Sequence, residues 1–280
     1  EPLTPLHIID HDGQPFEDDA LLVTPMRAVD ADTLAPALVH SLAHAWFRSS
    51  HVWLDEGVPQ FLSLLWLEHS RGREAALLQL RQEINTLALA EPAPAANAAD
   101  QKGQSLIEAS DEIYYRTKAA AVLWMLRSVV GNDALKQALR NYRRNGRREE
   151  DPRLFQSILE EGSHKDLNWL FDDWVYHDCG LPDLSIVNVT PRRLPQQGLK
   201  AASWLVAIEV RNDGDAAAEV PVTVRSGSLT TTERLRIAGR SSASIRIVFE
   251  GTPDEVIVND GSVPEVGAMT HVKKLVIQTQ

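Results

Sequence analysis

The stretch that decides the fold of the first part of this chain is His40-Ser-Leu-Ala-His44, followed after a short gap by Trp53-Leu-Asp-Glu-Gly57. Histidines four residues apart lie about one turn apart on one helix face, so both imidazoles can point at one ion. Glu56, at the start of a second helix, could supply a third ligand. Three protein ligands leave one position open for water or substrate, which is the usual arrangement of catalytic zinc. The spacing therefore predicts a metal centre.

Composition sets the broad class of the protein. At 280 residues, with 44% hydrophobic residues, the chain is long enough for two domains that each bury a core. A net charge of −11 argues against nucleic acid as a partner, because that role calls for clustered Lys and Arg. No apolar run approaches the ~20 residues of a membrane span. We expect a soluble protein; the sequence leaves the compartment open, and a periplasmic or secreted location is compatible with it.

The first two thirds of the chain reads as mainly helical. A short apolar strand is expected at residues 20–24. A helix starting near 33–36 follows, with an apolar stripe beside the two histidines. A second helix should begin at Asp55, a good N-cap residue. Further helices are expected at 73–89, 110–131, 132–143, 152–162 and 166–176, with a loop at 90–103.

Beyond residue 183 the pattern changes to short β-branched runs. Asn212-Asp-Gly214 and Asn259-Asp-Gly261 are turn signals between them. Several short strands at this spacing favour a β-sandwich of immunoglobulin type. The expected strands lie at 184–189, 204–210, 220–224, 244–249, 255–258 and 272–277.

Four segments together carry a resemblance to a known family: His40-Ser-Leu-Ala-His-Ala-Trp-Phe47, Trp53-Leu-Asp-Glu-Gly57, Lys118-Ala-Ala-Ala-Val-Leu-Trp-Met-Leu126 and Phe171-Asp-Asp-Trp-Val-Tyr-His-Asp-Cys-Gly-Leu-Pro-Asp183. The chain resembles the gluzincin aminopeptidases of the membrane alanyl aminopeptidase family over about residues 20–183. The first segment matches the HELAH-x-W-F pattern of that family at every position except the glutamate.

The resemblance implies an α+β protein. A mainly helical, thermolysin-like catalytic domain would occupy residues 1–182, and an immunoglobulin-like β-sandwich residues 183–280. It also implies a peptide or protein substrate and one zinc ion, with His40, His44 and Glu56 as the metal ligands. Asp55 would be a helix cap or would support a ligand. His51 is a conceivable extra ligand, but we expect a loop histidine.

Three departures from the family pattern bear on activity. Ser41 replaces the general-base glutamate, and losing a positioned base costs about 10²–10⁴-fold in rate. Only eleven residues separate His44 from Glu56, which is shorter than the family spacing by roughly two helical turns. The G-x-M-E-N segment, whose glutamate holds the free amine of the substrate, has no match in this sequence.

A fourth departure concerns the oxyanion. The family uses a tyrosine two residues before the lysine of the third segment, and that position is Arg116 here. Tyr114 and Tyr115, one or two places earlier, are candidates for the same catalytic role after a shift of register. Arg116 could also bind an oxyanion, although we expect a surface role for it.

Three functions remain open at this point. The first is a zinc metallopeptidase-like protein that binds peptides and hydrolyses them weakly or not at all, a pseudoenzyme. The second is an active aminopeptidase that uses another base. The third is a peptide- or protein-interaction module without a metal requirement.

Overall fold

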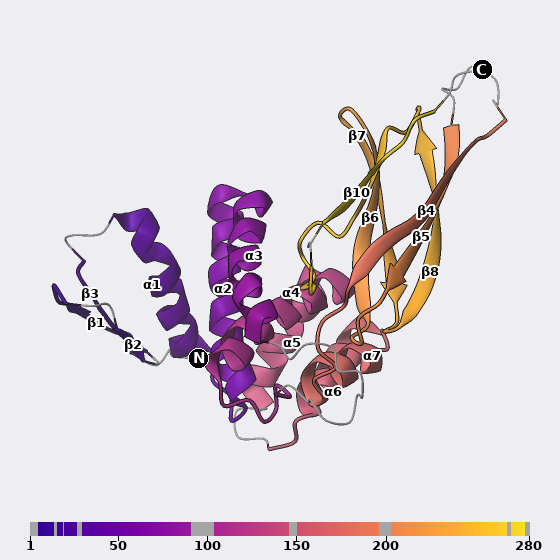
Figure 1. Cartoon of the computed structure of the whole chain (residues 1–280). Coiled ribbons are helices and arrows are strands. Elements are labelled where there is room, and N and C mark those ends of the chain that lie inside the picture. Colours follow the sequence, from indigo (N-terminus) through magenta and orange to yellow (C-terminus); the bar gives the residue numbers. More distant parts are fainter. Residues whose placement is uncertain are drawn as a thin grey trace. The chain divides into compact units, whose positions relative to one another are not determined.

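The computed structural model describes residues 5–13, 16–18, 20–26, 30–90, 104–145, 150–195, 203–267 and 270–277. These residues form two compact units, one up to residue 178 and one from 179 onward. The expected loop at 90–103 lies, apart from its first residue, outside the described residues. No described helix is long and apolar enough to cross a bilayer. Figure 1 labels the elements used below.

A small sheet opens the first unit. Its strands are β1 (His7–Asp10), β2 (Phe16–Asp18) and β3 (Leu21–Thr24), in the order β1-β3-β2. The central β3 confirms the strand expected at 20–24, and it pairs in parallel with β1 and antiparallel with β2. Phe16 and Asp18 are exposed while Glu17 between them is half-buried. The alternation of a strand therefore turns Glu17 to the face opposite its two neighbours.

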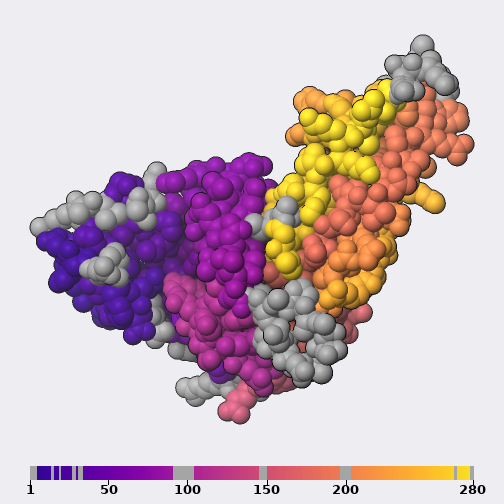
Figure 2. Space-filling view, viewed as in Figure 1, coloured from indigo at the N-terminus to yellow at the C-terminus, as the bar shows by residue number. Residues whose placement is uncertain are grey.

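Helices make up the rest of the first unit. They are α1 (Ala31–Trp46), α2 (Val52–Arg71), α3 (Arg73–Ala90), α4 (Ala119–Val130), α5 (Asn132–Asn145), α6 (Leu154–Ser163) and α7 (Asn168–Phe171). Two π-helices, η1 (Ile113–Lys118) and η2 (Asp172–Tyr176), precede α4 and follow α7. Part of the α2–α3 hairpin lies on the face shown in Figure 2.

Two expected helix starts were wrong. The first helix begins at Ala31, so Pro36 lies in its second turn and not its first. The second begins at Val52 with His51 as its N-cap, four residues before the predicted cap Asp55. Asp55 instead lies in the first turn, where its carboxylate accepts a hydrogen bond from the Ser49 N–H at 2.7 Å and pairs with Arg48. Asp55 thus closes the short connection between α1 and α2.

The core of the first unit is aromatic and centres on α4, whose residues 119–126 are all buried. Phe61 of α2 packs edge-on against Trp124 of α4, and Trp53 packs against Phe155 of α6. One ion pair lies inside this core, because Lys118 and Asp178 meet at 2.6 Å with no exposed side-chain surface. The pair connects the last residue of η1 to the segment that follows η2.

The second unit consists of two antiparallel sheets. One has the order β10-β9-β6-β7 and the other β4-β5-β8. Buried and less buried residues alternate along β5 and β6, so each sheet turns an apolar face inward. The strands are β4 (Leu184–Arg193), β5 (Ser203–Asn212), β6 (Ala218–Ser226), β7 (Leu229–Ile237), β8 (Ser241–Glu250), β9 (Glu255–Val258) and β10 (His271–Lys274).

The two Asn-Asp-Gly segments form loops that their asparagines hold from inside. Asn212 is fully buried; its Oδ1 accepts from the N–H groups of Asp183 and Gly214, and its Nδ2 donates to Ala216 O. Asn259 is also fully buried and holds the second loop in the same way, accepting from Gly261 N–H. The turn prediction was right, and the burial of the amides was not foreseen.

Candidate metal centre

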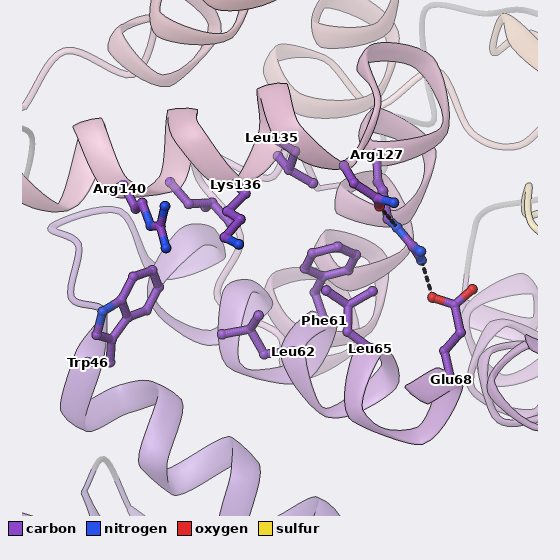
Figure 3. Close-up of a pocket in the computed structure, with 11 residues that line it drawn as sticks. Trp46, Phe61, Leu62, Leu65, Glu68, Arg127, Leu135, Lys136 and Arg140 are labelled. Atoms are coloured by element: carbon purple, nitrogen blue, oxygen red, sulfur yellow. Dashed lines mark hydrogen bonds and ion pairs between the residues drawn. The ribbon is translucent and has the colours of Figure 1, made fainter. Parts of the chain in front are cut away.

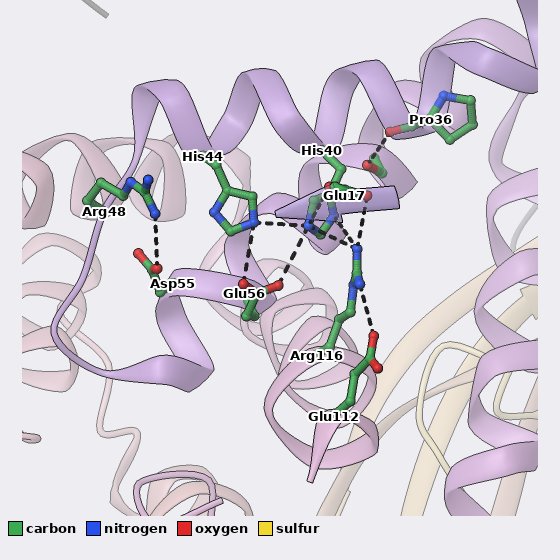
Figure 4. A network of polar contacts seen from close by, with 10 residues as sticks. Glu17, Pro36, His40, His44, Arg48, Asp55, Glu56, Glu112 and Arg116 are labelled. Atoms are coloured by element: carbon green, nitrogen blue, oxygen red, sulfur yellow. Dashed lines mark hydrogen bonds and ion pairs between the residues drawn. The ribbon is translucent and has the colours of Figure 1, made fainter. Parts of the chain in front are cut away.

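The two histidines of the first motif face one another on α1. His40 and His44 are 3% and 1% exposed, and their Nε2 atoms lie 3.1 Å apart. Their ring planes meet edge to face, with centroids 4.8 Å apart (Figure 4). Both nitrogens therefore point at one location, as the four-residue spacing predicts.

Glu56 of α2 reaches the same location. Its carboxylate oxygens lie 3.7 Å from Nε2 of His40 and 3.6 Å from Nε2 of His44. The connection from Trp46 to Val52 is short, and Asp55 locks it by binding Ser49 and Arg48. The shortened spacing between the two motifs thus still brings the carboxylate to the histidine pair.

Electrostatics favour the protonation states that a metal requires. Burial lowers the pKa of His40; the Glu56 carboxylate opposes this shift and the Arg116 charge adds to it. Burial acts to raise the pKa of Glu56, but hydrogen bonds from both histidines and the nearby Arg116 hold it well below its usual value. Neutral imidazole and ionised carboxylate are the forms that bind metal at neutral pH.

The donor set fits a single zinc ion. With bonds of about 2.0–2.2 Å, neighbouring ligand atoms of a tetrahedral zinc lie about 3.3 Å apart. The three separations of 3.1, 3.6 and 3.7 Å among His40, His44 and Glu56 are close to that value. Two imidazoles and a carboxylate are also a ligand combination typical of zinc.

The comparisons agree with this chemistry. The model of the peptidase family M1 domain matches residues 15–174, more than half of the chain. The chain belongs to peptidase family M1. Membership in this family implies zinc as the cofactor.

Relatives in the family are much longer than this chain. It is 26% identical over 245 residues to Aminopeptidase M1 of Arabidopsis thaliana, a match that covers 81% of this chain and 26% of that protein. It is 27% identical over 143 residues to Aminopeptidase N of Oryctolagus cuniculus, covering 45% of this chain and 15% of that protein. The chain thus spans about a quarter or less of these relatives.

A solved structure shares the fold. The crystal structure of Legionella pneumophila aminopeptidase A in complex with aspartic acid matches with a TM-score of 0.61 and 17% identity, over 92% of this chain and 31% of that one. The chain therefore shares the mixed helical and sheet fold of part of that structure.

Ser41 lies on α1 between the two histidines and is fully buried. Its hydroxyl has no hydrogen-bond partner among the residues that the structure describes. A serine hydroxyl without a basic partner stays protonated at neutral pH. Ser41 therefore offers neither a base nor an activated nucleophile.

Sequence reasoning missed Glu17 at this centre and expected Arg116 at the surface. Glu17 of β2 places Oε1 3.2 Å from His40 Nε2, and Arg116 of η1 places Nη2 3.1 Å from the same nitrogen (Figure 4). No local spacing links Glu17 to the histidines, since only the pairing of β2 with β3 brings it there. The expected surface role of Arg116 was wrong, because its guanidinium points inward between Glu17 and Glu112.

The other candidates lie in different surroundings. Tyr114 is buried with its hydroxyl directed at Ala90 O, 3.5 Å away, and its ring below the Lys118 ammonium. Burial raises the pKa of Tyr115, and the charges of Glu112 and Glu56 add to this shift. A catalytic role for either tyrosine stays a prediction. His51, at the N-cap of α2, is not part of a described group of potential metal ligands.

Two of the cavities that the described residues form lie in the first unit. One of about 330 Å³ adjoins the histidine pair, and its lining includes Glu17, His40, Gln60, Glu83 and Arg116. The other, about 540 Å³, is mostly apolar and lies between α2 and α5 (Figure 3). Its lining holds no histidine, so we assign the chemistry to the first cavity. The apolar cavity is lined by Trp46, Phe61, Leu62, Leu65, Glu68, Arg127, Asn132, Leu135, Lys136, Leu139 and Arg140.

Proposed function

We propose that this chain is an M1-type domain that binds one zinc ion and peptides, and that hydrolyses peptides weakly or not at all. His40, His44 and Glu56 are the proposed zinc ligands. The observation that carries the proposal is the convergence of their three donor groups within 3.1–3.7 Å. When bound, zinc would supply Lewis-acid polarisation of a peptide carbonyl and of water.

The weak or absent hydrolysis rests on Ser41. Peptide hydrolysis needs a group that takes a proton from water and passes it to the leaving amine. A buried hydroxyl without a hydrogen-bond partner cannot hold that proton at neutral pH. Loss of the general base lowers the rate of hydrolysis by about 10²–10⁴-fold. The proposed binding of peptides does not require this base.

The cavity beside the pair supports a peptide ligand. Arg116 lines this cavity, and its guanidinium can donate hydrogen bonds to a carbonyl oxygen or a carboxylate of the ligand. Polar side chains from α2 and α3 line its other side, where Gln60 and Gln79 donate to Glu83. A side chain of the bound peptide would occupy this space.

The domain assignment is part of the proposal. We propose a metallopeptidase-like domain at residues 1–182 and a second domain at 183–280 of the immunoglobulin-like class. The two antiparallel sheets with inward apolar faces support that class.

The test compares wild type with Ser41→Glu, each with zinc added, on a panel of aminoacyl amides. Ser41→Gln is the matched control, because it has the same bulk without a base. We expect negligible turnover by wild type and Ser41→Gln and a gain in Ser41→Glu. Robust wild-type turnover that a chelator abolishes would refute the loss of hydrolysis.

A second candidate, an aminopeptidase with another base, is favoured by one observation. The Glu17 carboxylate lies 3.2 Å from His40, so an acid other than the proposed ligand Glu56 is present at the centre. Turnover lost in Glu17→Gln would support this candidate. Metal analysis of the purified protein separates both candidates from a metal-independent interaction module.

A further inference from the structure

We propose that the apolar cavity between α2 and α5 binds a fatty carboxylate, with its chain along the apolar walls and its anionic head on Lys136 and Arg140. This inference does not rest on the proposed function, because the cavity shares no lining residue with the one beside the histidine pair. Its volume of about 540 Å³ lies within the ~300–1,000 Å³ that is typical of small-molecule sites.

The two cavities lie on different faces of α2. Residues three or four apart share a helix face, and each lining follows that spacing. The apolar cavity takes from α2 the side chains of Phe61, Leu62, Leu65 and Glu68, and the polar cavity takes those of Gln60, Ser63, Leu64, Leu67 and Arg71. A ligand in the apolar cavity therefore occupies a different space from the peptide proposed above.

The walls of the apolar cavity suit a hydrocarbon chain. Phe61 of α2 and Leu135 and Leu139 of α5 are buried, and Leu62 and Leu65 beside them are half-buried. The α5 helix packs mainly against α6, so its side toward α2 is left to line the cavity. Protein interiors are otherwise close-packed, and an apolar chain in this space would remove the surrounding surface from water.

One end of the cavity carries two positive charges. Lys136 and Arg140 lie four residues apart on α5, both are exposed, and neither has an ion pair or hydrogen bond to a residue that the structure describes. Like charges at this spacing destabilise a helix, and an anion bound between them would offset that repulsion. At the other end Arg127 is already paired with Glu68 (Figure 3). The available positive charge is therefore concentrated on one side of the cavity.

This combination selects an amphiphilic anion. Lysine and arginine form charge-assisted hydrogen bonds with a carboxylate, and the apolar walls offer an unbranched chain no polar group to compete with water. An uncharged apolar molecule would leave both cations without a counter-charge, and a cationic amphiphile would be repelled by them.

The test measures binding of decanoate to the whole chain by isothermal titration calorimetry, with 1-decanol and decylammonium as probes that keep the chain and change the head. Lys136→Gln/Arg140→Gln removes both charges. Arg192→Gln/Arg193→Gln, exposed on β4, is the matched control, because it removes the same net charge outside the lining. We expect decanoate to bind wild type and the control equally, and the first double variant about tenfold more weakly. Added salt should weaken decanoate binding to wild type.

A second pair of variants tests the wall of the cavity. Leu62→Gln should weaken decanoate binding, whereas Leu78→Gln, an exposed position on α3 outside the lining, should leave it unchanged. Wild type that does not bind decanoate, or that binds it no better than 1-decanol, would overturn the proposal. Wild type that sediments as a dimer, which Leu62→Gln converts to monomer and decanoate does not, would assign the cavity to a second copy of the chain and overturn it as well.

Discussion

At the scale of single residues, Glu83 of α3 is the most unusual acid outside the metal centre. Gln60 and Gln79 donate to its Oε1 at 2.9 and 3.0 Å, while Oε2 is buried without a partner among the described residues. Burial raises the pKa of Glu83, and the two amide hydrogen bonds only partly offset this. Glu83 is therefore harder to ionise in the folded protein than an exposed glutamate.

Glu83→Gln should stabilise the protein at neutral pH. An acid with a raised folded-state pKa contributes stability below its ordinary pKa, and that contribution is lost as pH rises through the raised value. Glutamine can still accept from both amides and carries no charge. We expect a higher free energy of unfolding than wild type at pH 7 and no gain near pH 4.

Urea denaturation at both pH values measures this difference. Glu161→Gln, an exposed acid on α6, is the control and should change little at either pH. A loss of stability in Glu83→Gln at pH 7 would contradict the argument from burial.

Residues at the metal centre were predictable to the extent that local geometry places them. His40 and His44 follow from helical periodicity alone, and the motif placed Glu56 near them. Glu17 and Arg116 could not be found in this way. Glu17 depends on a three-residue strand whose pairing is not local, and Arg116 depends on a π-helical turn that no periodicity indicates.

At the scale of elements, the position of Glu56 depends on the close approach of α2 to the start of α4. Gly57 permits it, because a Cβ atom at that position would lie 2.5 Å from the Cβ of Ala119. Both residues are buried in a close-packed interior, so moving either backbone would disrupt the packing around it. The glycine next to the proposed ligand thus fixes how near α2 lies to α4.

Gly57→Ala should therefore destabilise the first unit and weaken zinc binding together. Overpacking of a buried contact costs about 1–3 kcal/mol, and the displaced helix would carry Glu56 from the histidine pair. Thermal unfolding and chelator competition measure the two effects. Gly162→Ala in α6 is the control, because nothing lies within 4 Å of its Cβ position, and we expect it to be neutral or slightly stabilising. Unchanged zinc affinity in Gly57→Ala would contradict the positional argument.

The element types were predicted well where the pattern was long. The apolar stripe of α1 and the β-branched runs of β5, β6 and β8 gave the correct type of element. The strand β7 was missed, because Thr, Glu and Arg dominate its sequence and most of its side chains are exposed. Both π-helices were predicted as parts of ordinary helices, since the extra residue per turn leaves no signature in composition.

At the scale of the whole molecule, the two units have separate internal chemistry. Glu17, His40, His44, Glu56 and Arg116 all belong to the first unit. The second unit contains a different polar network, in which the buried carboxylate of Glu265 accepts from Asn259 at 2.6 Å and contacts His271 at 2.9 Å. The hydrogen bond to Glu265 raises the pKa of His271, against the opposing effect of burial.

These networks predict two unfolding transitions that respond to different conditions. Zinc should bind only the folded first unit, so zinc at 100 times its dissociation constant should stabilise that unit against unfolding by about 2.7 kcal/mol and leave the second unit unchanged.

The contribution of His271 to the stability of the second unit is present below its ordinary pKa of 6.5 and is lost as pH rises through the raised value. In the presence of a chelator, raising the pH from 6 to 9 should therefore lower the unfolding temperature of the second unit in wild type but not in His271→Gln. Differential scanning calorimetry on the intact chain measures both shifts, and a single transition that zinc and pH move as one would show that the two units do not unfold as separate domains.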